Sequence, residues 1–150
     1  MRHAKQKNQP KLRKGHRLAL MANLSSALFI KGKIKTTKAK AKALRPFSEK
    51  IITLAKKAEV TEDCSKKLHY RRLAIARIRS KKAVNELFNN KVSEFTNRCG
   101  GYTRIYKLAY RRKGDAAEMA LIELINKSDN GYKKSTNKKK IKKSLVIKNK

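Results

Sequence analysis

Apolar and small side chains recur every three to four residues through the first 60 positions, a spacing that predicts two amphipathic helices. The first is expected to begin at His16 and to end at Gly32, because glycine favours the position just after a helix. Its predicted buried face consists of Leu18, Met21, Ala22, Ser25, Leu28 and Phe29. The second is expected to begin after Thr37, a capping residue type, and to kink or break near Arg45 because Pro46 follows. Its predicted buried face consists of Ala41, Leu44, Ser48, Ile51, Ala55 and Ala58.

The pattern also predicts a short strand and two further helices. The strand covers Lys33–Thr36, which is β-branched, and an acidic loop is expected at Glu59–Asp63. A third helix is expected over Lys66–Arg79, and a fourth from about Lys81, with Asn89–Asn90 as an early end point. The third helix is expected to bury Leu68, Leu73 and either Ile75 or Ala76, and the fourth Val84, Leu87, Phe88 and Phe95.

After Gly100–Gly101 the hydrophobic period changes from helical spacing to strict alternation. The alternating run from Tyr102 to Arg111, the turn residues Lys113–Asp115 and the apolar run Met119–Ile125 predict a β-hairpin with a longish loop. The chain is therefore expected to form one small α+β domain, with about four helices packed on a short sheet. Residues 16–126 would form this domain, residues 1–15 a basic arm, and residues 127–150 a lysine-rich extension.

The charge pattern points to a nucleic acid. All ten acidic residues lie between Glu49 and Asp129, whereas residues 1–48 carry 14 Lys/Arg and residues 130–150 carry nine. The formal net charge is +32, and a compact chain with this charge repels itself unless a polyanion neutralises it. Basic, acid-free segments at both ends are the electrostatic footprint of a nucleic-acid binder.

Individual cations suggest phosphate contacts. Arg13, Lys14, Arg17 and the Lys33–Lys35 segment would mostly bind phosphates and position the protein, rather than read bases. Lysines at positions 38, 40 and 42 would lie in the first turns of the second helix, where the helix dipole disfavours cations. An external anion is expected to compensate for this conflict.

RNA is favoured over DNA, because the chain lacks zinc-finger spacing and leucine-zipper heptads. A basic arm without its own core suits insertion between folded RNA helices. A DNA architectural protein is the alternative, and it would kink duplex DNA with apolar wedges.

Other function classes are not supported. Cys64, Cys99 and the scattered histidines match no metal site, and no cofactor or small-molecule substrate is expected. His3 and His16 could serve a ribonuclease, but one of them lies in the predicted arm, so contacts to RNA are the preferred interpretation and no catalytic residue is expected. No membrane span is expected, and reduced thiols suggest a cytoplasmic location.

Three tyrosines on the predicted hairpin, Tyr102, Tyr106 and Tyr110, allow two interpretations. They could stack on RNA bases, as aromatic side chains do on single-strand binding surfaces. They could instead cover the inner face of the hairpin against the helices. The second interpretation is favoured, because a hairpin in so small a domain needs apolar cover.

A series of short motifs resembles one known family, the bacterial large-subunit ribosomal protein seventeen family. The resemblance covers about residues 1–126 and is specific because about a dozen blocks occur in one order. These blocks include Met1–His3, Gly15–Arg17, Ile34–Thr37, Ala39–Lys42, Leu44–Pro46, Ile52–Lys56, Arg72–Ala74, Gly100–Ile105, Gly114–Ala117 and Met119–Leu124. Two departures are an extension of the third helix over Lys66–Tyr70 and a tail at Asp129–Lys150.

The resemblance implies a structural, non-catalytic protein that binds large-subunit ribosomal RNA near the polypeptide exit tunnel and contacts neighbouring ribosomal proteins. The family's basic positions correspond to Arg2, His3, His16, Arg17, Lys35, Lys40 and Arg104. Together with the charge pattern, they give the candidate RNA-binding set Arg2, His3, Lys5, Arg13, Lys14, His16, Arg17, Lys33, Lys35, Lys38, Lys40 and Arg104. The alternative function is that of an RNA chaperone or ribosome assembly factor.

Overall fold

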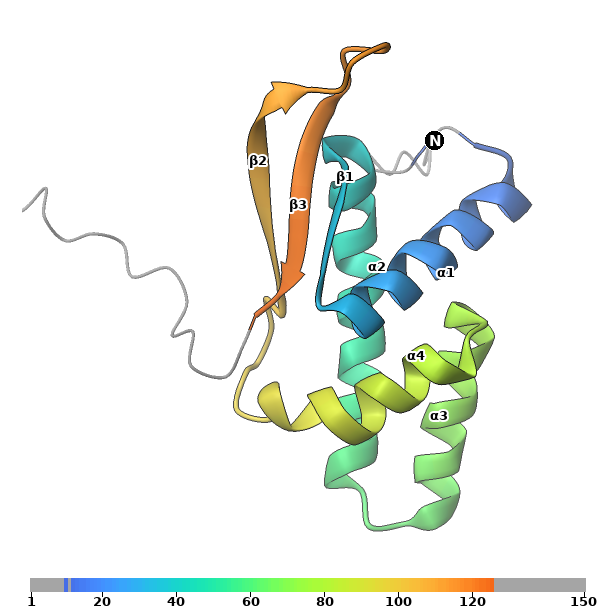
Figure 1. The fold of residues 1–150 in the computed structure, drawn as a ribbon. Coiled ribbons are helices and arrows are strands. Elements are labelled where there is room, and N and C mark those ends of the chain that lie inside the picture. Colours follow the sequence, from blue (N-terminus) through green and yellow to red (C-terminus); the bar gives the residue numbers. More distant parts are fainter. Residues whose placement is uncertain (1–9, 11, 126–150) are drawn as a thin grey trace, which may run out of the picture.

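The computed structural model describes residue 10 and residues 12–125. In this part of the chain, helices pack against one face of a three-stranded antiparallel sheet (Figure 1). The helices are α1 (Lys14–Lys31), α2 (Lys38–Val60), α3 (Cys64–Ile78) and α4 (Lys81–Asn85), which continues as the π-helical η1 (Glu86–Lys91) and the 3₁₀-helical η2 (Val92–Glu94). The strands are β1 (Lys33–Thr37), β2 (Thr103–Arg111) and β3 (Glu118–Leu124). The predicted α+β fold, with four helices and a hairpin, is confirmed.

Helix α1 buries the predicted face except at its start. Met21, Ala22, Ser25, Leu28 and Phe29 are buried, whereas Leu18 is 43% exposed. The prediction for Leu18 was wrong because the first turns of α1 project beyond the elements that cover the rest of the helix (Figure 1). The helix ends at the predicted glycine, since Gly32 has φ +75°, a conformation that glycine adopts without steric cost.

Helix α2 forms the centre of the domain, and every residue of its predicted buried face is buried. The helix is continuous from Lys38 to Val60 with Pro46 inside it, so the break predicted near Arg45 does not occur. Ser48 packs in the core beside this proline, and its Oγ donates hydrogen bonds to the carbonyl oxygens of Leu44 and Arg45 at 3.0 Å. Thr37 occupies the N-cap position as predicted, but its side chain makes no capping hydrogen bond.

The loop between α2 and α3 is shorter than predicted, because α2 continues to Val60 and α3 already begins at Cys64. Asp63 caps α3, and its Oδ1 accepts a hydrogen bond from the Ser65 backbone N–H at 2.9 Å.

The buried face of α3 differs from the prediction. Ala74 and Ile78 are its buried residues, Leu73 and Ile75 are half-buried, and Ala76 is exposed. Leu68 was expected in the core but is 48% exposed, because the first turns of α3 extend past the core.

The fourth helical segment does not end at Asn89–Asn90 as predicted. The chain instead widens into the π-helical η1, in which a residue pairs with the fifth one along. This wider turn places Val92 on the same side as Leu87, and both are buried. The two asparagines point outward, where Asn90 Nδ2 donates to Glu86 Oε2 at 2.8 Å.

The sheet has the order β1-β3-β2, so the last strand in the sequence is the central one. In one row across the sheet, Ile34 and Ile105 both pair with Ile122, and these residues face the helices. The predicted hairpin is formed by β2 and β3. Its loop contains Gly114 with φ +103° and an Arg112–Asp115 ion pair, whose hydrogen bond lowers the pKa of Asp115 to about 2.

A polar cluster attaches the start of the hairpin to α2. Thr103 is 1% exposed, and its Oγ1 donates to Glu49 Oε1 at 3.1 Å. Arg45 Nη2 donates to the carbonyl oxygen of Thr103 at 3.1 Å, and Arg45 Nε lies 3.8 Å from the same carboxylate of Glu49. These contacts fix the position of β2 relative to α2, whose first turns carry Lys38, Lys40 and Lys42.

Replacing Phe95 by alanine is expected to destabilise the domain by about 3–5 kcal/mol, because the change leaves a cavity in the core. Phe95 is fully buried, and its ring meets that of Tyr102 edge-on with centroids 5.6 Å apart. Urea unfolding followed by circular dichroism measures this loss. The control Val60→Ala removes a side chain that is 77% exposed and is expected to change stability by less than about 0.5 kcal/mol. Similar midpoints for the two variants would show that Phe95 is not a core residue.

Candidate nucleic-acid interface

Cations gather around the start of α1. Arg13 precedes the helix, and it is exposed together with Lys14 and His16, while Arg17 is half-buried. The first turn contains no acidic side chain, so nothing in the helix itself offsets the positive end of its dipole. Exposed cations beside free backbone N–H groups suit the binding of phosphate.

A second group of cations lies at the start of α2, as predicted. Lys42 is exposed, Lys40 is half-buried, and no acidic residue lies in the first turn. Lys38 differs, because its Nζ forms an ion pair with Glu118 of β3. This hydrogen bond and the charge of Lys38 lower the pKa of the Glu118 carboxyl group. For Lys38, the anion expected from outside is thus supplied within the chain, whereas Lys40 and Lys42 form no ion pair within residues 12–125.

The starts of α1 and α2 lie on the same half of the molecule in Figure 1. We call the basic side chains at these two helix starts the arm-side surface, because the predicted arm of residues 1–15 leads into it in the sequence. It consists of Arg13, Lys14, His16, Arg17, Lys38, Lys40 and Lys42.

Three further candidates lie on the sheet. Lys33 and Lys35 of β1 are exposed, and Arg104 of β2 is half-buried. Arg104 Nη1 donates a hydrogen bond to Tyr106 Oη at 3.2 Å. The strand register places all three cations on the sheet face opposite the helices, because their neighbours Ile34 and Ile105 face the core.

The prediction that the three tyrosines cover the core is correct for Tyr102 alone. Tyr102 is 4% exposed, and its Oη donates to the carbonyl oxygen of Arg98 at 3.2 Å. Tyr106 is 38% exposed and Tyr110 is 52% exposed. The helices cover the beginning of β2, and the rest of the hairpin extends beyond them (Figure 1).

The structure also shows a basic surface that was not predicted from the sequence. Residues 64–85 contain eight Lys/Arg and no acidic residue, and they form α3, α4 and the short turn between them. We call the exposed cations of this segment the α3 surface: Lys66, Lys67, Arg72, Arg77, Arg79, Lys81 and Lys82. The acid-free run is visible in the sequence. The charge of residues 49–129 taken together does not reveal it, because acidic residues lie on both sides of it.

The length of α2 separates the arm-side lysines from the start of the α3 surface. The arm-side lysines occupy its first turns, and α3 begins just beyond its other end (Figure 1). A helix of 23 residues is about 34 Å long at 1.5 Å per residue. Lys66 and Lys67, at the start of α3, are therefore too far from the arm-side lysines for a single phosphate contact to serve both. The end of α3 lies closer, beside α1, where Ser26 Oγ donates to the carbonyl oxygen of Ile78 at 3.5 Å.

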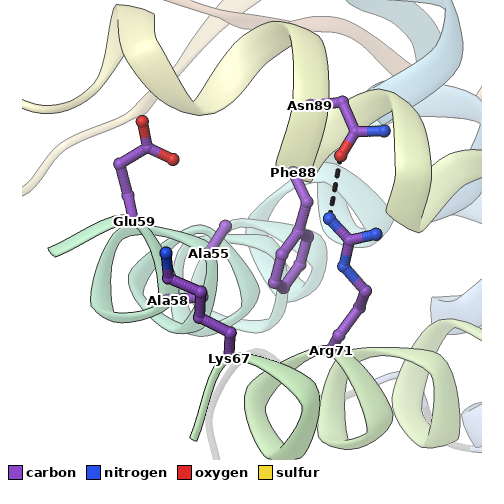
Figure 2. A pocket seen from close by; sticks show the side chains of 7 residues that line it. All are labelled: Ala55, Ala58, Glu59, Lys67, Arg71, Phe88 and Asn89. Carbon is purple, nitrogen blue, oxygen red and sulfur yellow. Dashed lines mark hydrogen bonds between the residues drawn. The ribbon is translucent and has the colours of Figure 1, made fainter. Parts of the chain in front are cut away.

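A pocket of about 310 Å³ lies between α2, α3 and η1. Figure 2 shows Phe88 and Ala55 in its wall, with Lys67, Arg71 and Glu59 around it. Arg71 Nη2 donates to Asn89 Oδ1 at 2.8 Å, and its guanidinium lies over the Phe88 ring, 5.5 Å from the centroid. One carboxylate and two cations supply no nucleophile paired with a base, so the lining residues do not form a catalytic arrangement.

Three of the candidate RNA-binding residues belong to the first part of the predicted arm. Arg2, His3 and Lys5 lie outside the described residues. Within the described part of the chain, no cluster of three or more His, Cys, Asp or Glu side chains could hold a metal ion. No helix in that part is long and apolar enough to cross a membrane.

Comparison with known proteins decides the family. The family model described as "Ribosomal protein L17" matches residues 20–125. The chain belongs to the ribosomal protein L17 family. The resemblance seen in the motifs is thereby confirmed, and membership makes the chain a ribosomal protein rather than an enzyme.

Relatives from several bacteria support this assignment, and each is named "Large ribosomal subunit protein bL17". The relative from Opitutus terrae is 54% identical over 139 residues, covering 93% of this chain and 81% of its own length. The relative from Methylacidiphilum infernorum is 49% identical over 82% of this chain and 87% of its own length. The one from Persephonella marina is 50% identical over 77% of this chain and 88% of its own length. Because 139 matched residues exceed residues 1–126, part of the extension after residue 126 has a counterpart in the Opitutus relative.

Proposed function

We propose that this chain is a structural constituent of the large ribosomal subunit that binds ribosomal RNA and bridges two of its segments. The single observation that carries the bridging is the presence of two basic surfaces on one domain, one at the starts of α1 and α2 and one that begins beyond the far end of α2. The naming of its relatives supports assembly into the large subunit. A position near the polypeptide exit tunnel is the part of the proposal that rests on the family resemblance alone.

The physical basis of the bridging is electrostatic. Each phosphate that a lysine or arginine neutralises releases counterions from the RNA, and this release drives association. Bringing two RNA segments together costs free energy, because their phosphates repel each other. A domain that places cations against both segments offsets this repulsion, and its fixed core sets the distance between them. The same arrangement explains how a chain with a net charge of +32 becomes stable on its target.

Matched pairs of charge-neutralising variants test the bridging. Lys40→Gln with Lys42→Gln removes two charges from the arm-side surface, and Arg72→Gln with Arg77→Gln removes two from the α3 surface. Each pair is expected to make the slope of log affinity against log salt shallower, by the equivalent of about two phosphate contacts. In hydroxyl-radical footprinting of assembled large subunits, each pair is expected to weaken protection of a different ribosomal RNA segment.

Two outcomes would contradict the proposal. If both pairs weakened protection of the same RNA segment, the two surfaces would serve one site and the protein would not bridge. If quantitative mass spectrometry of gradient-separated ribosomes found the wild-type protein mainly in the free pool, an RNA chaperone or assembly factor would be favoured. We expect about one copy per large subunit, with the protein absent from small subunits.

A further inference from the structure

The face of the sheet that points away from the helices combines one aromatic ring with apolar and basic neighbours. In one row across the strands, Lys35 and Tyr106 flank Leu121. In the next outward-facing row, Lys33 and Arg104 flank Glu123. Side chains of directly paired residues lie on the same face of an antiparallel sheet, so these two rows form one continuous surface.

Tyr106 is held in place on this surface without being covered. Its Oη accepts a hydrogen bond from Arg104 Nη1 at 3.2 Å, yet 38% of the residue is exposed. Leu121 on the neighbouring strand is half-buried and provides an apolar floor beside the ring. Among the described residues, the ring–ring contacts join His69 to Tyr70 and Phe95 to Tyr102, so no ring of this part of the chain stacks on Tyr106.

We propose that this outer sheet face binds an unpaired RNA nucleotide, whose base stacks on Tyr106. This inference rests on the proposed binding of ribosomal RNA and adds a second mode of contact to it. Every base has a π-face that can stack on a tyrosine, but in a duplex both faces are already covered by neighbouring bases. The target is therefore a loop, bulge or single strand rather than a helix.

Charge complementarity supports RNA as the occupant. Lys33, Lys35 and Arg104 contribute three positive charges to the face, and Glu123 contributes one negative charge. Lys35 lies two strands from Tyr106, about 10 Å away at the usual strand spacing, so its flexible side chain can reach the phosphate of a stacked nucleotide. The exposed ring binds the base, and the cations on either side bind its backbone.

Three single substitutions test this mode of binding. Tyr106→Leu removes the ring but keeps an apolar side chain, and Tyr106→Phe keeps the ring. Tyr110→Leu makes the same change at another exposed tyrosine of β2, which lies beyond the irregular register between Lys107 and Arg111. Binding is measured to an unstructured oligouridine and to an RNA duplex of equal length. Each affinity is measured over a series of salt concentrations, which separates the contribution of phosphate contacts from that of stacking.

Tyr106→Leu is expected to weaken oligouridine binding by roughly 5- to 150-fold, the range for loss of one base–aromatic stack. Its duplex affinity and its salt dependence should stay at the wild-type values, because no phosphate contact is lost. Tyr106→Phe and Tyr110→Leu are expected to stay within about twofold of wild type for both RNAs. In ultraviolet cross-linking of intact large subunits, the peptide containing Tyr106 is expected to carry a nucleotide.

Equal losses for Tyr106→Leu and Tyr110→Leu would overturn the proposal, because the effect would then not belong to this face. A wild-type oligouridine affinity for Tyr106→Leu would do the same. Cross-links from Tyr106 to a neighbouring protein, or to residues 126–150 of this chain, would assign the face to another occupant. None of these results would affect duplex binding or the copy number on large subunits, so failure here is distinguishable from failure of the proposed function.

Discussion

Raising the salt concentration from about 50 to about 200 mM is expected to weaken binding of this chain to large-subunit ribosomal RNA by about 10³–10⁵-fold. This range corresponds to roughly six to ten neutralised phosphates. The described residues can supply that number, because the arm-side surface contains six Lys/Arg side chains and the α3 surface contains seven. Filter binding of the full chain over a salt series measures the slope of log affinity against log salt.

Neutralising variants provide the control for this slope. The pair Lys40→Gln with Lys42→Gln should make the slope shallower by about two contacts, whereas Tyr106→Leu should leave it unchanged. A nearly flat response of the wild-type protein would contradict the electrostatic mechanism for both surfaces together. A steep slope that neither neutralising pair alters would place the contacts on residues outside the described part of the chain.

The sequence correctly predicted the buried face of a helix where neighbouring elements cover that face along the whole helix. In α2, all six predicted positions are buried, since α2 contacts the other helices and the sheet. The same periodicity was wrong for Leu18 and Leu68, which lie in the first turns of α1 and α3. Periodicity shows which side of a helix is apolar, but how far the neighbouring elements extend along that side depends on the tertiary structure.

The hairpin shows the same limit for strands. Alternation correctly predicted β2, β3 and the turn between them. It did not predict which tyrosines are buried, because Tyr102 precedes the strand and packs against Phe95, whereas Tyr106 lies on the opposite face. The alternation also could not predict the order of the strands. The pairing of β1 with β3, which only the structure shows, places Lys35 in one row with Tyr106.

The candidate interface was predictable in its chemistry but not in its geometry. Charge counts identified the arm and the start of α2, because no acidic residue interrupts them. The Lys38–Glu118 ion pair could not be inferred, since these residues are 80 positions apart and meet only when β3 lies beside β1. The distance between the arm-side lysines and the start of α3 follows from the length of α2, and it is this distance that suggests bridging.

Deleting the arm is expected to abolish stable incorporation of this chain into large subunits, whereas deleting the tail is expected only to reduce affinity at higher salt. The arm deletion removes residues 1–11 of the predicted arm 1–15, which leaves Arg13 and all of α1 in place. The tail deletion removes residues 130–150. Incorporation is measured for both at one ionic strength, by mass spectrometry of purified subunits.

The arm lies within the family-like motif series and leads directly into the arm-side surface. An arm inserted between RNA helices makes close, desolvated contacts, in which each phosphate interaction is weakly screened. The tail is rich in lysine and has Tyr132 as its one aromatic residue, so it is expected to make looser contacts that salt screens strongly.

Charge alone predicts the opposite order, which makes the comparison decisive. The tail deletion removes nine Lys/Arg, but the arm deletion removes only four. If affinity depended on the number of cations, loss of the tail would be the more damaging change. The expected order therefore requires that a few cations held in a defined path contribute more than many that are loosely placed. Greater damage from the tail deletion would mean that the C-terminal segment, rather than the arm, is the terminus that holds the RNA.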